Sequence, residues 1–409
     1  SENLLRLPEV LQNSGHTCAA FSTIVQVSRE VGFDYGFDAF YELFRGPEES
    51  AAYPLNTELA GLLPSSEDLN AALFPWIEEH ADEDFFVLAW SIDTHVPYTV
   101  PLDRAEFVDE AFRREPLEID YKSRYFSAEE MRLVKQLYES CIFYNDAQFG
   151  RLCGFLKDLN IYDDCLLVVL GDHGEVFDEH SDPRSRLGET INRLRKKGEN
   201  QVLHRRRGHI VVPPYDEDIH VPLIFKFPQN RFAGTRSARL ASLVDVSPTI
   251  LGLASPESRV SQLGLDGKNL MPYLTEEAPP ESEEVVFCSG KSYQGLPHYY
   301  CVRSPKWKYI LTEVPMLSAG ALARNGISYL ASHLRNQFLL AKEALYDLQE
   351  GEDENVIKHY PEVAASMRAK LDAWRKRCKV NRYRQEKQLS LHEMDAVNER
   401  QLRALGYMK

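Results

Sequence analysis

Two short polar segments carry side chains of the types that bind metal ions and anionic esters. In the first, Gly171-Asp-His-Gly-Glu175, a carboxylate lies beside an imidazole, and the flanking glycines let the backbone turn sharply and leave room for an ion. It directly follows an apolar run that ends at Leu170, and open α/β sheets bind ligands at the carboxyl ends of such strands. The pattern indicates a metal site at Asp172 and His173, with a plain turn carrying an N-cap as the alternative.

The second segment, Asp93-Thr-His-Val-Pro-Tyr98, follows an apolar run that ends at Ser91. It is therefore expected at the same edge of the sheet as the first. His95 could hydrogen-bond a bound anion or a leaving oxygen, because an imidazole with a pKa near neutrality both donates and accepts. An ordinary loop histidine is the alternative, and the placement of both segments at strand ends favours the site.

A third cluster, Arg205-Arg-Arg-Gly-His209, lies between these segments and the C-terminal part of the chain. His209, or less readily His204, could reach the site from a loop. Residues 184–207 hold nine Lys or Arg against two Glu, so they could attract a negatively charged substrate toward the metal. A solvated surface loop is the alternative for this basic stretch.

The elements that must position these side chains are short apolar strands separated by helices. Runs without polar alternation predict strands covered on both faces, as in a parallel α/β sheet; they are 85–91, 165–170, 222–227 and 285–288. Between the first two, Ser127 and Glu130 form a capping-box pattern ahead of a helical rhythm from 134 to 155, which fits a crossover helix.

The pattern changes after about residue 283. Residues 302–311 are typical of an antiparallel strand, and helical patterns follow. We therefore expect a catalytic α/β domain over 1–282 and a smaller C-terminal subdomain over 283–409.

Composition excludes several classes of protein. A chain of 409 residues with 44% hydrophobic residues can bury a large core. Its net charge of -15 would repel nucleic acid and anionic membranes. Seven scattered Cys without a CxxC pair predict neither a disulfide framework nor a structural zinc site, and no apolar run of about 18 residues could span a bilayer.

At these segments the sequence resembles the sulfatase family of the alkaline phosphatase superfamily. Gly171–Glu175 resembles the family's metal motif, Asp93–Tyr98 its substrate-side histidine segment, and Tyr215–Phe225 the strand-entry segment after the active-site loop. Weaker collinear matches are 7–11, 32–38, 245–251, 303–309, 343–348 and 402–407. The resemblance implies an alkaline-phosphatase-like α/β fold, a mostly parallel sheet covered by helices on both faces, with a smaller C-terminal α+β subdomain.

The resemblance also implies roles for particular residues. Asp172 and His173 would be metal ligands, while His95 and His209 would contact the sulfate or phosphate group and act in catalysis. Arg207, at the end of the basic stretch, is expected to bind substrate through its positive charge. Oxygen ligands favour a hard ion, so Ca²⁺ is the first choice with Mg²⁺ beside it, and the imidazole of His173 leaves Mn²⁺ or Zn²⁺ open. The substrate would be a sulfate or phosphate ester of a small molecule or glycan.

The sequence departs from the family in the residues that should supply the nucleophile. It has no Cys/Ser-x-Pro-x-Arg segment whose Cys becomes formylglycine; Ser181-Asp-Pro183 is the nearest approach, but position 185 is Ser. Residues 21–26 read Phe-Ser-Thr-Ile-Val-Gln, where many sulfatases carry a lysine and a histidine. A fragment is the favoured explanation, because a sheet without a central strand leaves ladder groups unpaired; natural loss of catalysis is the other.

The expected function is metal-dependent hydrolysis of sulfate esters. The alternatives are a phosphodiesterase or phosphotransferase of the same superfamily, and an inactive protein that binds anionic glycans. Oligomeric state, including a homo-oligomer, is left open. The start of the chain lacks the basic and apolar regions of a signal peptide, so the expectation is cytoplasmic for this chain alone, or secreted or periplasmic if a signal was lost.

Overall fold

Nine segments of the chain are described by the computed structural model: residues 6–45, 64–114, 125–177, 204–205, 213–254, 263–275, 284–291, 297–314 and 341–380. The α-helices are α1 (Leu7–Gln12), α2 (Ser66–Glu79), α3 (Glu110–Arg114), α4 (Ala128–Asp158), α6 (Asp216–Ile219), α7 (Val246–Ala254) and α10 (Pro361–Val380). The 3-10 helices are η1 (Leu43–Arg45), η2 (Leu102–Arg104), η3 (Pro228–Asn230), η4 (Leu243–Asp245) and η6 (Met271–Leu274).

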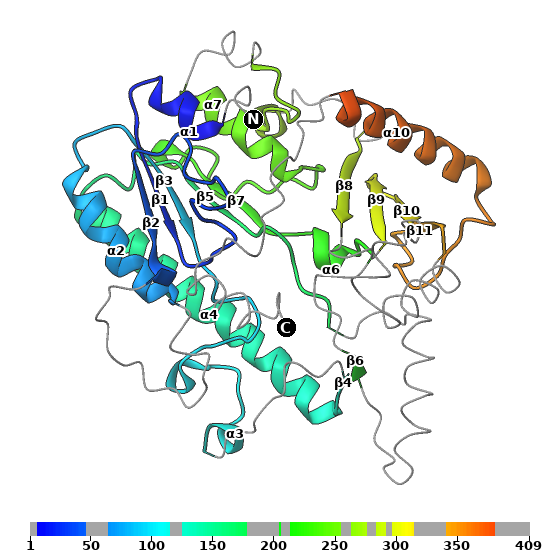
Figure 1. Cartoon of the computed structure of the whole chain (residues 1–409), viewed down its shortest axis with the longest axis horizontal. Coiled ribbons are helices and arrows are strands. Elements are labelled where there is room, and N and C mark those ends of the chain that lie inside the picture. Colours follow the sequence, from blue (N-terminus) through cyan, green and yellow to red (C-terminus); the bar gives the residue numbers. More distant parts are fainter. Residues whose placement is uncertain are drawn as a thin grey trace.

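Among the described residues, the strands form two larger sheets and two separate pairs (Figure 1). They are β1 (Thr17–Ser22), β2 (Ala39–Glu42), β3 (Phe85–Trp90), β4 (Tyr125–Phe126), β5 (Leu167–Leu170), β6 (His204–Arg205), β7 (Leu223–Lys226), β8 (Val286–Lys291), β9 (His298–Arg303), β10 (Trp307–Glu313) and β11 (Glu343–Asp347).

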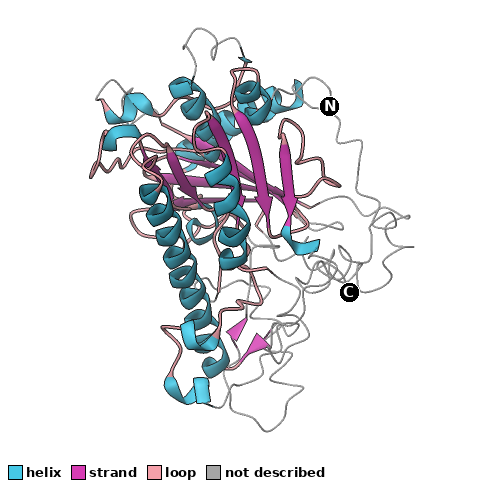
Figure 2. Cartoon of the chain, turned by 90° about the vertical axis from the view of Figure 1, so that its left-hand side faces the viewer, coloured by secondary structure: helices cyan, strands magenta, loops and turns pink. Residues whose placement is uncertain are grey.

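A parallel sheet with the order β2-β1-β3 lies at the centre of the N-terminal part. Its middle strand is covered on both faces. Ala19 and Phe21 pack against α2 and α4, whereas Cys18 packs against α1 and α7 on the other face. Successive side chains of a strand point to opposite faces, so the alternation along β1 divides these helices into two layers. Figure 1 labels α2 and α4 on one side of the strands and α1 and α7 on the other, and in Figure 2 helices pass in front of the strands.

The helix predicted between the first two apolar runs is confirmed as α4. The Ser127 hydroxyl accepts a hydrogen bond from the Glu130 amide at 3.1 Å, and the Glu130 carboxylate accepts one from the Ser127 amide at 2.6 Å. These two bonds satisfy N–H groups that the first turn of a helix leaves unpaired. The helix then runs alongside α2 toward β5 (Figure 1).

The strand pair β5·β7 corrects part of the prediction for residues 165–170 and 222–227. Strand β7 pairs with β5 in antiparallel register, with Leu170 opposite Leu223. The pair is not covered evenly either, because Leu170 and Ile224 are 41% and 58% exposed. An apolar run predicts that a strand is buried, but it does not predict whether the neighbouring strand is parallel or antiparallel. That direction depends on the long connection between the two strands.

The C-terminal sheet is antiparallel with the order β11-β10-β9-β8. Residues 285–288, predicted for the parallel sheet, contribute to its edge strand β8, which pairs antiparallel with β9. Residues 302–311, predicted as one strand, form the end of β9 and most of β10, because Ser304 turns the chain: its amide donates to the Trp307 carbonyl at 2.8 Å. Helix α10 covers one face of this sheet.

The fold class is therefore α/β with a parallel sheet between helical layers and a separate antiparallel sheet toward the C-terminus, as predicted. All seven Cys are free; Cys18, Cys141 and Cys301 are buried and Cys378 is exposed. Within the described segments no helix is both long enough and apolar enough for a bilayer crossing.

Candidate active site

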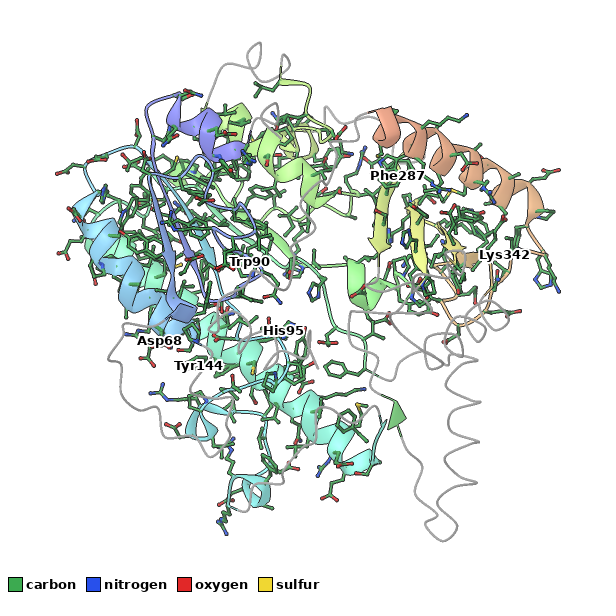
Figure 3. The ribbon with its side chains drawn as sticks, in the orientation of Figure 1. Asp68, Trp90, His95, Tyr144, Phe287 and Lys342 are labelled. Atoms are coloured by element: carbon green, nitrogen blue, oxygen red, sulfur yellow. The ribbon has the colours of Figure 1, made fainter. Side chains whose placement is uncertain are left out.

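A cavity of about 120 Å³ lies where strands β3 and β5 end. Because about 10 to 15 Å³ of such volume already holds one water, the cavity has room for a small tetrahedral group. Its described lining comprises Ile24, Gln26, Val27, Trp90, Ser91, Ile92, Thr94, His95, Tyr138, Asp172, His173, Gly174 and Glu175. The two strand-end segments expected to converge thus line one cavity, and Figure 3 shows His95 close to Trp90, at the end of β3.

Asp93 anchors the loop that carries His95. Its carboxylate accepts hydrogen bonds at 3.1 Å from the backbone amide of Ser66, and a shorter one from the Ser66 hydroxyl, at the start of α2. The side chain is only 5% exposed. Asp93 is therefore a structural residue that ties the His95 loop to a helix, and it is not directed at substrate.

Burial raises the pKa of Asp93 to about 6, and the hydrogen bonds from Ser66 only partly offset it. The unfolded carboxyl has a pKa of about 3.9. Between these values the folded protein keeps a proton that the unfolded chain loses. The contribution of Asp93 to the free energy of unfolding is therefore fully present below about pH 4 and is lost as the pH rises through 6. This loss amounts to on the order of 2 to 3 kcal/mol.

We expect the Asp93→Asn variant to remove this pH dependence, because the amide is neutral at every pH and keeps the shape of the carboxyl group. Relative to the unmodified protein, the variant should gain on the order of 2 kcal/mol of unfolding free energy between pH 4 and pH 7. Urea unfolding at the two pH values measures the difference, with the surface variant Asp103→Asn as control. If the difference in unfolding free energy between the variant and the unmodified protein were the same at both pH values, the pKa of Asp93 would not be raised in the folded protein.

The side chain of His95 has a defined hydrogen-bonding state. Its Nδ1 lies 2.5 Å from the carbonyl oxygen of Val96; a carbonyl only accepts, so Nδ1 carries a hydrogen. The backbone amide of His95 also donates to the Ile92 carbonyl at 2.8 Å. The remaining ring atom, Nε2, is consequently the one that gains or loses a proton.

The turn after β5 holds Asp172 and His173 side by side. The His173 amide donates to Asp172 Oδ1 at 2.9 Å, and His173 Nδ1 donates to the Gly174 carbonyl at 2.8 Å. His173 Nε2 lies 3.6 Å from Asp172 Oδ2, with side-chain exposures of 36% and 51%. A ligating histidine commonly has its other nitrogen fixed in this way by a carbonyl, which sets the tautomer and the ring orientation.

These two residues fit part of a metal site. A carboxylate oxygen and an imidazole nitrogen so close together, both at the cavity and both partly exposed, can face one cation. In the described segments no group of three or more His, Cys, Asp or Glu side chains gathers as a metal site would require. Asp172 and His173 would supply two ligands of such a site, and the assignment remains a prediction.

A hydrogen bond between buried side chains joins the two segments. The Tyr98 hydroxyl donates to Glu175 Oε2 at 2.9 Å, across 77 positions of sequence. The Tyr98 ring packs against the rings of Tyr138 and Phe177. The loop that carries His95 and the turn that carries Asp172 are thus held at one spacing by a polar contact inside an apolar cluster.

Apart from its imidazoles, the described lining carries no side chain that can be positive. It contains the carboxylates Asp172 and Glu175 and the imidazoles of His95 and His173, and no Lys or Arg among the described residues. Gln26 adds a neutral amide whose nitrogen and oxygen are both shielded from solvent and, among described residues, have no hydrogen-bond partner. Binding of an anion in this cavity therefore requires positive charge from a cation or from other residues.

Gln26 is a site residue that sequence reasoning did not select. It ends the segment 21–26, which was noted only for lacking a lysine and a histidine. The local sequence around Gln26 does not indicate that its side chain lies on the wall of the cavity. His209 and Arg207 lie outside the described residues, as does most of the basic stretch 184–207, and the backbone of His204 belongs to β6, paired with β4.

Comparison with known proteins gives one family. Residues 4–256 match the sequence model of the family described as Sulfatase. Arylsulfatase K of Homo sapiens is 24% identical over 276 residues, which cover 62% of this chain and 40% of the human protein. Two further curated relatives are matched over 24% of their length, so the chain spans less than half of these relatives.

Solved structures share the fold. One, determined in complex with its substrate D-glucosamine-2-N,6-O-disulfate, aligns with a TM-score of 0.59 at 15% identity and covers 94% of this chain and 84% of its own. The phosphonate monoester hydrolase of Agrobacterium radiobacter aligns with a TM-score of 0.55 at 17% identity, covering 91% and 80%. At such identities the similarity concerns the fold alone.

Proposed function

This chain belongs to the sulfatase family, and we propose that it forms the metal-binding and leaving-group side of a site that hydrolyses sulfate esters. The observation that carries the proposal is the shared cavity: His95 from the end of β3 and Asp172 with His173 from the end of β5 line it together. A cation site facing an imidazole is the arrangement that ester hydrolysis of an anion needs. No residue of the printed sequence is assigned as the nucleophile.

Asp172 and His173 would hold the cation. When bound, a divalent cation supplies the positive charge that neutralises the ester oxygens. Ca²⁺ is our first choice because carboxylate oxygen is a hard ligand, with Mg²⁺ next, while the imidazole of His173 keeps Mn²⁺ and Zn²⁺ open. The hydrogen bond from His173 Nδ1 to the Gly174 carbonyl supports this role, because it leaves Nε2 as the ligating nitrogen.

His95 would protonate the leaving oxygen. Its Nδ1 is committed to the Val96 carbonyl, so the transferable proton sits on Nε2, directed by a loop that Asp93 ties to α2. General acid catalysis of this kind contributes about 10²- to 10⁴-fold in rate. By the family pattern, His209 would contact the transferred group. Arg207 would bind it from the basic stretch, and Gln26 would offer its amide to an ester oxygen from the wall of the cavity.

The substrate we propose is a sulfate ester, on a small molecule or a glycan. Support comes from the family and from a neighbour solved with a sulfated glucosamine as its substrate. A second candidate, a phosphonate or phosphodiester hydrolase, is supported by the phosphonate monoester hydrolase with the same fold.

A substrate comparison with purified protein separates these functions. With CaCl₂ or MnCl₂ present, we expect p-nitrophenyl sulfate to be cleaved with a kcat/KM at least about tenfold above that for p-nitrophenyl phosphate or a phenylphosphonate ester. EDTA should abolish the activity. Preference for the phosphorus esters would support the second candidate. Tight binding of a sulfated disaccharide with no hydrolysis of any ester would support a binding protein in its place.

A further inference from the structure

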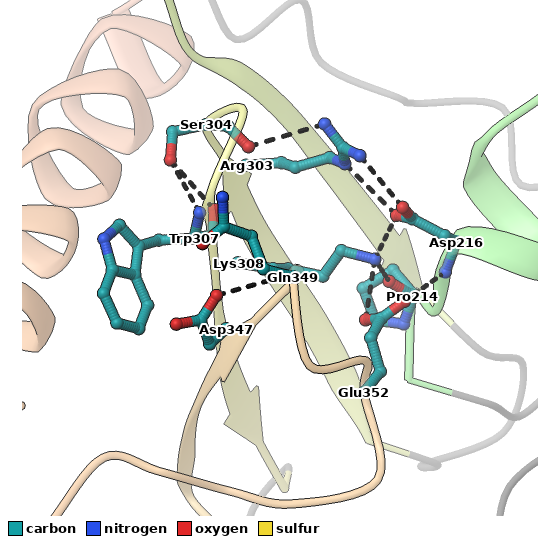
Figure 4. Close-up of polar contacts among 9 residues, drawn as sticks. All are labelled: Pro214, Asp216, Arg303, Ser304, Trp307, Lys308, Asp347, Gln349 and Glu352. Atoms are coloured by element: carbon teal, nitrogen blue, oxygen red, sulfur yellow. Dashed lines mark hydrogen bonds and ion pairs between the residues drawn. The ribbon is translucent and has the colours of Figure 1, made fainter. Parts of the chain in front are cut away.

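A buried group of charges connects the C-terminal sheet to the short helix α6. Lys308 of β10 is fully buried and its Nζ contacts the Asp216 carboxylate; it also lies 2.7 Å from Glu352 Oε1 and donates to the Pro214 carbonyl at 3.2 Å. Arg303 of β9 contacts the same Asp216 carboxylate at 3.0 and 3.2 Å. Figure 4 shows Lys308 and Arg303 both reaching Asp216, the first residue of α6, with Glu352 and Pro214 around Lys308.

The carboxylate of Asp216 offsets the repulsion between two positive charges on the C-terminal sheet. Lys308 and Arg303 lie directly opposite each other on neighbouring antiparallel strands, and like charges in such a pair repel. Asp216 lies between them and offsets the repulsion. Burial alone would raise the pKa of Asp216, but hydrogen bonds from Arg303 and Lys308 outweigh it and lower the pKa to about 2. The backbone amide of Asp216 also donates to Glu352 Oε2 at 2.7 Å. Both the side-chain carboxylate and the backbone amide of Asp216 are thus held by hydrogen bonds.

Helix α6 in turn contacts the turn that carries the candidate metal ligands. The amide of Gly174 donates to the Asp218 carbonyl at 2.7 Å. A Cβ atom on Gly174 would lie 2.0 Å from the carbonyl oxygen of Glu217, so the turn packs on the backbone of α6 with no room for a side chain. The carbonyl oxygen of the same Gly174 accepts a hydrogen bond from His173 Nδ1.

We propose that Lys308, Arg303 and Asp216 are positioning residues that hold α6 against Gly174 and so fix the orientation of Asp172 and His173. The C-terminal sheet would thereby set the geometry of the metal site without touching metal or substrate. The expected effect on metal binding rests on the proposed function. The link from Lys308 to Gly174 rests only on contacts within the chain. Apolar packing of Tyr215 and Ile219 on the same face of the sheet supports the link.

The test measures local order and metal affinity in the full-length protein. In metal-free protein, Lys308→Met should speed hydrogen exchange of the peptide 171–177 about tenfold or more, while β1 (Thr17–Ser22) exchanges as before. In titrations with MnCl₂, affinity should fall about tenfold, the lower end of the range for partners that orient metal ligands. The control Lys306→Met, two positions earlier and 47% exposed in its ion pair with Asp347, should change neither.

A second variant covers the case in which Lys308→Met does not fold. Asp216→Asn keeps the shape of the side chain and leaves Lys308 paired with Glu352, so it should fold while loosening α6. Unchanged exchange at 171–177 together with unchanged Mn²⁺ affinity in a folded variant would overturn the proposal. If the unmodified protein binds none of Ca²⁺, Mg²⁺, Mn²⁺ and Zn²⁺, the proposed function fails, and the exchange measurement still decides whether Lys308 positions the turn.

Discussion

Replacing Asp172 with Asn is expected to weaken binding of Ca²⁺ or Mn²⁺ by more than about 100-fold. Partners that only orient a metal ligand are already worth about 10- to 100-fold in affinity, and Asn removes the negative charge of a direct ligand while keeping its shape. The hydrogen bond from the His173 amide to Asp172 Oδ1 can be retained by the amide oxygen of Asn. The turn should therefore stay folded and lose only its affinity for the cation.

Two measurements check this prediction. Calorimetric titration gives the affinity directly, and a rise in Tm with added metal reports the same binding through its linkage to folding. We expect the metal-dependent rise in Tm to disappear in Asp172→Asn and to persist in Asp146→Asn, a control on the exposed side of α4. Equal metal affinity in both variants would remove Asp172 from the site.

Replacing His95 with Gln is expected to lower kcat by about 10²- to 10⁴-fold for esters with a poor leaving group, because those need a proton on the leaving oxygen. For p-nitrophenyl sulfate, whose leaving oxygen is stable without a proton, the loss should be much smaller. Comparing an alkyl and a nitrophenyl sulfate ester separates loss of the acid from general damage to the site.

His359→Gln serves as the control, since this histidine is exposed and follows the C-terminal sheet. It should leave both rates unchanged. If His95→Gln slowed both esters equally, His95 would bind or position the substrate and would not act as the acid. The mutation should not alter metal affinity, because His95 lies on a different strand end from Asp172 and His173.

Part of the fold follows directly from local patterns in the sequence. The capping box at Ser127 and Glu130 predicted the start of α4, because both hydrogen bonds form between residues three positions apart. The apolar runs predicted β3 and β5, and with them the two strand ends at the cavity. In each case the determining interactions are local or depend only on burial.

Other features depend on contacts between distant residues. Strand β1, the middle of the parallel sheet, was not predicted, because Cys18, Ala19 and Ala20 are small and give a weak strand signal. The antiparallel direction of β7 depends on how the chain returns to β5. The contact between Lys308 and Asp216 spans 92 positions, and no periodicity within either segment indicates it.

The candidate site divides in the same way. The types and positions of His95, Asp172 and His173 were sufficient to predict a shared location, since both segments follow the carboxyl end of a strand, where open α/β sheets bind ligands. The bond from Tyr98 to Glu175 and the inward position of Gln26 required the folded structure. His209 and Arg207 lie outside the described residues, so their roles stay predictions.

The most direct test is a crystal structure of the protein grown with MnCl₂ and sulfate, using the anomalous signal of manganese. We predict one manganese ion within about 2.0 to 2.6 Å of an Asp172 oxygen and of His173 Nε2. A sulfate should bridge that ion and His95 Nε2, with a hydrogen bond of about 2.7 to 3.2 Å. Manganese bound elsewhere, or a sulfate that reaches the ion while His95 faces away from it, would contradict a single shared site.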